Sequence, residues 1–176
     1  MSLLQPLADL REDKELFPTL QRLQECLCAE LEAAKGPALC YCGLMVGDIM
    51  PLELMDCERG NCGVAWVRPV QAFPSTVFPD PDVGDGSCES PLAMTIEVGV
   101  ARCYPTARDR NGLDPQQFFE AARLYMSDLQ AARRAIQCCL ESERFDGSHS
   151  VDAWEPIPAE GGVSGGIWMV TVRPGA

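Results

Sequence analysis

The chain has 176 residues, of which 47% are hydrophobic and 23% charged, a composition typical of a globular protein with one folded domain. Its 26 acidic and 14 basic residues give a formal net charge of −12 at pH 7, which argues against a protein that binds duplex DNA through its phosphates. Residues 1–6 lack the basic and apolar pattern of a signal peptide, and no apolar run is long enough to span a membrane. We therefore expect synthesis in the cytoplasm and no membrane partner.

The first predicted element is a helix over residues 16–35, which Gly36 and Pro37 end. Its apolar stripe consists of Leu16, Leu20, Leu23, Leu27 and Leu31. An apolar run at residues 38–46 predicts a strand. A second strand is predicted at residues 63–73, where Arg68 and Pro69 indicate a bulge or an edge strand.

Residues 74–91 are rich in Pro, Gly and Asp, and we expect a long loop that is either disordered or ordered by a partner. The carboxylates of Asp80, Asp82 and Asp85 lack the spacing of an EF-hand calcium loop.

The clearest strand is predicted at residues 92–104, because apolar side chains alternate along one face. These side chains are Leu92, Met94, Ile96, Val98 and Val100. Alternation puts Glu97 on the other face, where we expect it to meet solvent or a neighbouring subunit.

Asp114 and Pro115 open a predicted helix that runs to about residue 142. Its expected core-facing stripe is Phe118, Ala122, Tyr125, Leu129, Ala132, Ile136 and Leu140. The segment around Trp154 and a final strand at residues 166–173 predict a hairpin.

The ten cysteines show no spacing that is diagnostic of a metal site. On a helix, Cys26 and Cys28 point about 200° apart and cannot share a ligand. We expect most thiols to be reduced and to pack as small apolar groups, with one or two disulfides or a metal site as alternatives. If one pair is linked, the four-residue gap favours Cys57 with Cys62.

We assign no catalytic, cofactor-binding or metal-ligating residue. His149 is the only histidine, so a small hydrolase would have to use this one residue. The glycine-rich residues 161–166 lack the lysine of a phosphate-binding loop. Trp66, Arg68 and Trp168 are our candidate subunit-interface residues.

The order of the predicted elements, together with residues 62–76, 96–105 and 165–173, resembles the tail terminator proteins of long-tailed phages that infect actinobacteria. The resemblance covers most of the chain. It implies an α+β fold, with a mainly antiparallel sheet and two long helices packed on one face. It also implies a single domain over residues 1–176, with the loop at about residues 74–91 as an insertion.

The resemblance further implies a homohexameric ring at the neck of the virion, assembled in the host cytoplasm. Such a ring caps the tail tube, stops its polymerisation and provides the docking surface for the head. Its partners are then further copies of itself, the major tail tube protein and the head-closure (stopper) protein. DNA would pass through the lumen without specific binding, which an acidic protein suits.

Two other functions stay open at this stage. One is another head-to-tail connector component, a stopper or an adaptor, although the stopper family resembles a small β-barrel and fits two long helices poorly. The other is a cysteine-rich metal-binding module that uses Cys40, Cys42, Cys57 and Cys62.

Overall fold

A computed structural model describes residues 13–47, 62–83, 90–105, 114–142, 145–160 and 162–175. Within them the order of elements is α1 (Leu16–Ala33), β1 (Tyr41–Leu44), β2 (Gly63–Pro74), β3 (Leu92–Cys103), α2 (Pro115–Leu140), β4 (Gly147–Glu160) and β5 (Val163–Pro174). Each predicted helix and strand is present. The first strand is only four residues long.

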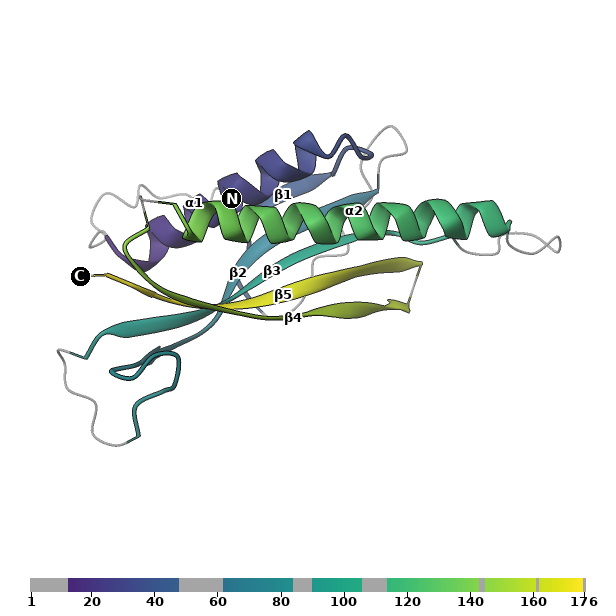
Figure 1. Ribbon diagram of the computed structural model, residues 1–176. Helices are drawn as coiled ribbons and strands as arrows, with labels where there is room; N and C mark the ends of the chain where they lie inside the picture. The colour runs from purple at the N-terminus through teal and green to yellow at the C-terminus, as the bar shows by residue number, and fades with distance from the viewer. Residues whose placement is uncertain are drawn as a thin grey trace, which may run out of the picture.

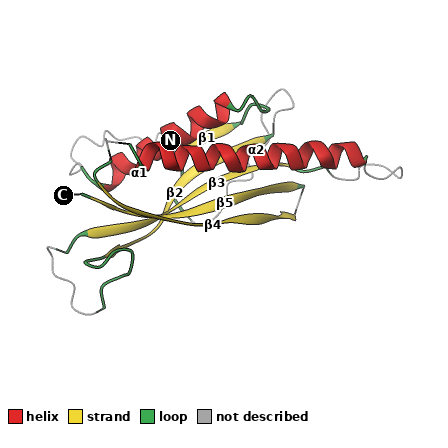
Figure 2. Ribbon diagram, in the orientation of Figure 1, coloured by secondary structure: helices red, strands yellow, loops and turns green. Residues whose placement is uncertain are grey.

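The strands form one sheet in the order β1-β2-β3-β5-β4. β1 runs parallel to β2, and the other neighbouring strands are antiparallel. Helices α1 and α2 lie on one face of this sheet (Figures 1 and 2). The expected α+β fold, with a mainly antiparallel sheet and two long helices on one face, is confirmed. We call the opposite side the open face, because no helix of the described residues covers it.

Both helices begin where side-chain carboxylates accept backbone hydrogen bonds. Asp13 accepts from the N–H groups of Glu15, Leu16 and Phe17 at 2.7 to 3.1 Å. Partial burial acts to raise the pKa of Asp13, but these hydrogen bonds outweigh it and lower the pKa. Asp114 is the predicted N-cap of α2 and accepts from the N–H of Gln116 at 3.0 Å.

The core lies between the helices and the sheet. From α1 it takes Leu20, Leu23, Leu27 and Leu31, as the leucine stripe predicted. From β3, the central strand, it takes Met94, Ile96, Val98 and Val100 of the predicted alternating residues. The prediction was wrong at Leu92, which is exposed and does not join the core. Burying each such side chain stabilises the fold by roughly 1.5–3 kcal/mol.

Only the second half of α2 joins this core. Its buried residues are Asp128, Ala131, Ala132, Ala135, Ile136, Cys139 and Leu140. The expected stripe was wrong at Ala122, which is exposed, and no residue between Pro115 and Ser127 is buried. The other two stripe residues in this half are half-buried: Phe118 packs against Tyr104, and Tyr125 packs against Trp154 of β4.

The predicted irregularity at Arg68 and Pro69 is confirmed and has a simple cause. The register between β2 and β3 shifts between Pro69 and Gln71. β1 pairs with β2 only up to Val67, so among the described residues no strand pairs with the remainder of β2 on that side. A proline there removes no hydrogen bond to β1.

One buried ion pair joins β3 to α2. Arg102 donates through Nε and Nη2 to the two carboxylate oxygens of Asp128, at 2.6 and 2.9 Å. Its Nη1 donates to the carbonyl oxygen of Pro37 at 2.7 Å. A single guanidinium therefore holds three parts of the fold together.

The expectation of mostly reduced thiols was wrong for the described cysteines. Disulfides join Cys26 to Cys139, Cys28 to Cys42 and Cys62 to Cys103. Cys40 is also disulfide-bonded, while Cys138 is a free, exposed thiol. Cys26 and Cys28 do point to different neighbours, as helical geometry required.

The predicted link of Cys57 with Cys62 was also wrong. Gly63 pairs with Arg102 in the β2–β3 ladder, so the next residues outward, Cys62 and Cys103, lie opposite each other. Their Cα atoms are 5.5 Å apart, a normal cross-strand disulfide distance. Cys57 lies outside the described residues.

Candidate interaction surfaces

The end of β2 and the start of β3 extend beyond the rest of the sheet as a projecting hairpin (Figure 1). We call residues 70–83 and 90–93 the arm. On the arm side of the bulge, Gln71 to Pro74 pair with Thr95 to Leu92, so the two strands support each other. Neither β1 nor β5 pairs with the strand residues of the arm, because β1 ends opposite Val67 and β5 pairs with β3 only from Met94 onward.

The loop of the arm is held by contacts from its own chain. Arg173 of β5 donates through Nη1 to the carbonyl oxygens of Ser75 and Thr76, both at 3.1 Å, and its guanidinium lies 5.4 Å from the centre of the Phe78 ring. Asp82 accepts from the N–H and the hydroxyl of Thr76 at 2.7 and 2.6 Å. These contacts link residues 75–83 to each other and to β5, whereas residues 84–89 of the predicted loop lie outside the described residues.

These contacts also give Asp82 a different role from the calcium ligand considered above. The hydroxyl and N–H of Thr76 stabilise the carboxylate of Asp82 and lower its pKa. Asp85, the third carboxylate of that pattern, lies outside the described residues.

The arm exposes apolar side chains to solvent: Val70, Val77, Val83 and Leu92. Such residues are normal when scattered singly, but here four of them lie on one projecting element. The described residues of the arm include two carboxylates, Asp80 and Asp82, and no lysine or arginine, although the guanidinium of Arg173 lies against the arm. The arm is thus an apolar surface with two acidic side chains.

On the open face, Trp66 lies over Gly99 of the neighbouring strand. A Cβ atom on Gly99 would come within 2.2 Å of the Trp66 ring, so only glycine leaves room for the indole. Trp66 Nε1 donates to Glu97 at 2.6 Å, and Arg68 Nη2 donates to the other oxygen of Glu97 at 2.7 Å. The expectation that Glu97 meets solvent or a subunit was wrong, because these two partners bury it.

The structure brings two of the candidate interface residues, Trp66 and Arg68, to this one cluster. Trp66 is only 2% exposed, so it has almost no surface left for a second subunit. Arg68 is held by Glu97 and by the carbonyl oxygen of Gly47 at 2.8 Å. Both residues therefore have contacts within the subunit, and the Nε of Arg68 is buried without a hydrogen-bond partner among the described residues.

The third candidate, Trp168, lies on the helix side of the sheet and packs against Trp154, with ring centres 5.6 Å apart. Its Nε1 is buried and has no hydrogen-bond partner among the described residues. Trp168 lines a pocket of about 300 Å³ together with Arg133, Ile136, Gln137, Val151 and Asp152. Because it lines a pocket and Trp66 does not, Trp168 is a better contact candidate than Trp66.

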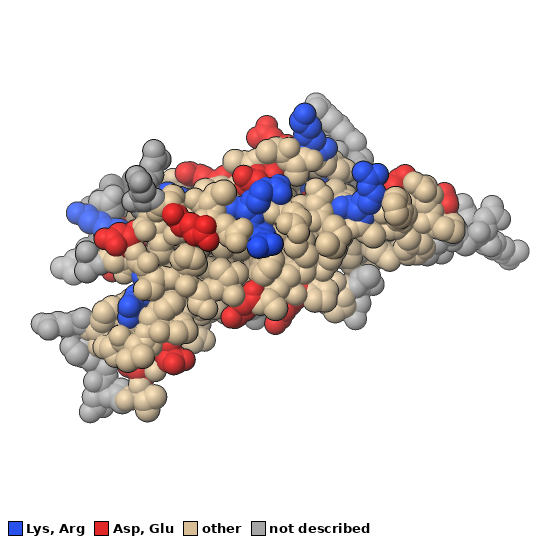
Figure 3. Space-filling view, in the orientation of Figure 1, with Lys and Arg blue, Asp and Glu red and all other residues tan. Residues whose placement is uncertain are grey.

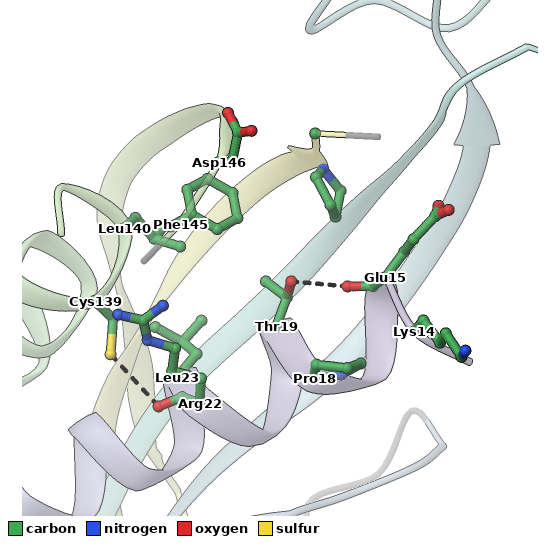
Figure 4. A pocket seen from close by; sticks show the side chains of 12 residues that line it. Lys14, Glu15, Pro18, Thr19, Arg22, Leu23, Cys139, Leu140, Phe145 and Asp146 are labelled. Atoms are coloured by element: carbon green, nitrogen blue, oxygen red, sulfur yellow. Dashed lines mark hydrogen bonds between the residues drawn. The ribbon is translucent and has the colours of Figure 1, made fainter. Parts of the chain in front are cut away.

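A second pocket, of about 250 Å³, lies between the start of α1 and the end of α2 (Figure 4). Two of its polar side chains are engaged: the Thr19 hydroxyl donates to the carbonyl oxygen of Glu15 at 2.9 Å, and Arg22 donates to Ser142. The sulfur of Cys139 is bonded to Cys26. The pocket therefore offers no free nucleophile from this cysteine.

Three of the four cysteines proposed as metal ligands are not free thiols. Cys42, Cys62 and Cys40 are all disulfide-bonded, and Cys57 lies outside the described residues. Within the part of the chain that the structure describes, no group of three or more His, Cys, Asp or Glu side chains could hold a metal ion. His149, the only candidate for a hydrolase, lies in β4 against the ring of Phe145.

Among the described helices, none is long and apolar enough to cross a membrane. A search of known protein families gives no match to this chain, and no curated protein is significantly similar to it.

Proposed function

We propose that this protein is a ring-forming structural subunit of a phage neck, of the tail terminator type. The observation that carries the proposal is the arm, a hairpin that projects from the domain and exposes Val70, Val77, Val83 and Leu92. An exposed apolar element costs solubility unless a partner covers it, so it favours assembly with other subunits. The α+β arrangement is also the one that the resemblance implies.

In this role the subunit binds further copies of itself, ends growth of the tube by contacting the major tail tube protein, and presents a surface to the head-closure protein. The resemblance implies six subunits. A net charge of −12 suits a lumen through which DNA slides, because carboxylates repel phosphates. The protein would act at the neck of the virion and form no covalent bond with its partners.

The first experiment compares oligomeric state by negative-stain microscopy and light scattering. The wild-type protein should form closed rings. The double variant Val70→Asp/Val77→Asp should not, because it places charges on valines that are 49% and 71% exposed. Val46→Asp is the matched control, since Val46 is 87% exposed and lies outside the arm.

The second experiment tests the biological role directly. Phage particles produced without this protein should carry tails of abnormal length that fail to join filled heads. Tails of normal length, joined to heads, would exclude the terminator function even if the purified protein forms rings. A failure of joining with normal tail length would favour another connector component.

A further inference from the structure

The outer side of α2 carries a continuous stripe of residues that the core does not use. Phe119 and Met126 are 59% and 52% exposed. They share one helix face with Arg123, Gln130, Arg133 and Gln137, because successive members are three or four residues apart. Arg133 and Gln137 also line the pocket that contains Trp168, so the stripe leads into this pocket.

The charge of this surface is opposite to that of the whole protein. Between Phe119 and Leu140 the helix has three arginines, Arg123, Arg133 and Arg134, and two carboxylates, Glu120 and Asp128, of which Asp128 is buried against Arg102. Figure 3 shows basic side chains over the middle of α2 on this face. Arg134 is paired with Glu30, whereas no ion pair engages Arg123 or Arg133 among the described residues.

Two features of the stripe match the arm. The stripe offers exposed apolar side chains, as the arm does. Its arginines complement the carboxylates of Asp80 and Asp82, the two acidic side chains among the described residues of the arm.

The two surfaces lie on different elements of the subunit. In Figure 1 the arm projects at the lower left, and α2 begins at the right. Two different, complementary surfaces on one chain produce head-to-tail association, which closes into a ring when the rotation per subunit allows it. A contact between identical surfaces would stop at a dimer.

We propose that the arm of one subunit docks on the α2 stripe of the next copy of this chain, with Met126 and the Trp168 pocket at the centre of the contact. This inference rests on the ring-forming function proposed above and assigns the two surfaces that build the ring. Residues Asp80 of the arm and Arg123 and Arg133 of the stripe supply the complementary charges.

The test uses two variants that each lose one surface. Val70→Asp/Val77→Asp alters only the arm, and Phe119→Asp/Met126→Asp alters only the stripe. Circular dichroism and thermal unfolding first establish that both remain folded. Each variant alone should be a monomer. Mixed in equal amounts they should form a 1:1 dimer and nothing larger, because only one intact arm and one intact stripe remain per pair.

The outcomes separate this inference from the proposed function. Rings formed by either variant alone, or a mixture that stays monomeric while wild-type protein forms rings, would overturn the arm–stripe contact and leave the ring function standing. A wild-type protein that stays monomeric at all concentrations would also overturn the contact. The tail-length experiment then decides the function independently.

Discussion

Replacing the buried carboxylate of Asp128 with an amide should cost much more stability than the same change in an exposed ion pair. The side chains of Arg102 and Asp128 are 8% and 7% exposed, and two hydrogen bonds at 2.6 and 2.9 Å join them. Asp128→Asn leaves the guanidinium of Arg102 buried without its counter-charge. Breaking such a pair costs about 3–5 kcal/mol, and for a chain of this size that lowers the Tm by roughly 6–20 °C.

The matched control is Glu30→Gln, which breaks the pair between Glu30 and Arg134. These side chains are 29% and 48% exposed, so solvent screens their interaction and the expected cost is at most about 1 kcal/mol. Urea unfolding followed by tryptophan fluorescence gives both free energies. Equal losses for the two variants would refute the reasoning that burial makes Asp128 important.

A double variant separates lost charge balance from lost packing. Arg102→Met with Asp128→Leu removes both charges and keeps apolar volume, so most of the stability should return. The recovery should be incomplete, because Arg102 also donates to the carbonyl oxygen of Pro37 and methionine cannot. A double variant as unstable as Asp128→Asn would mean that packing, and not an uncompensated charge, causes the loss.

Three further predictions concern the cross-links, the open face and the arm. Peptide mapping without reduction should recover the Cys26–Cys139, Cys28–Cys42 and Cys62–Cys103 links, and peptides with unlinked thiols would contradict this pairing. Removing the Cys62–Cys103 link, whose cysteines are 41 residues apart in the chain, should lower the free energy of unfolding by about 4 kcal/mol on the chain-entropy estimate. Gly99→Ala should displace the Trp66 ring and cost about 1–3 kcal/mol, visible as a shift in tryptophan emission, whereas an unchanged spectrum and stability would show that the indole does not lie there. The pKa of Asp82 is lower in the folded protein than in the unfolded chain, so its stabilising contribution is complete above about pH 4 and is lost as the pH falls through the folded pKa. Protection of the Thr76 amide from hydrogen exchange should therefore decrease on acidification in the wild type. The same protection should not decrease in Asp82→Asn.

Local patterns in the sequence predicted the elements well because each depends on residues close together in the chain. The leucines of α1, the alternation from Met94 to Val100 in β3 and the Asp114 cap each follow from a short stretch of sequence and lie where expected. The expected stripes were wrong at Leu92 and Ala122, which are exposed. Whether the end of a strand or helix is covered depends on the elements packed against it, and spacing within the element does not contain this information.

The contacts that define the candidate surfaces were not predictable in the same way. Arg173 reaches Ser75 across 98 residues, Trp66 reaches Glu97 across 31, and Cys26 is bonded to Cys139 across 113. Pairing of this kind follows from strand order and register, which single-sequence patterns do not give. The sequence did indicate that Cys26 and Cys28 point to different sides of their helix and so have different neighbours. It did not indicate which residues those neighbours are.

The disulfides join the elements that carry the two surfaces of the proposed head-to-tail contact. A head-to-tail chain closes into a ring only if the angle between its two binding surfaces is the same in every copy. The Cys26–Cys139 link fixes α2, which carries the stripe, to α1, and the Cys28–Cys42 link fixes α1 to β1 beside β2. The Cys62–Cys103 link joins β2 to β3, the two strands that continue into the arm. Covalent links thus brace the path from one surface to the other, while the exposed valines remain free to make the contact.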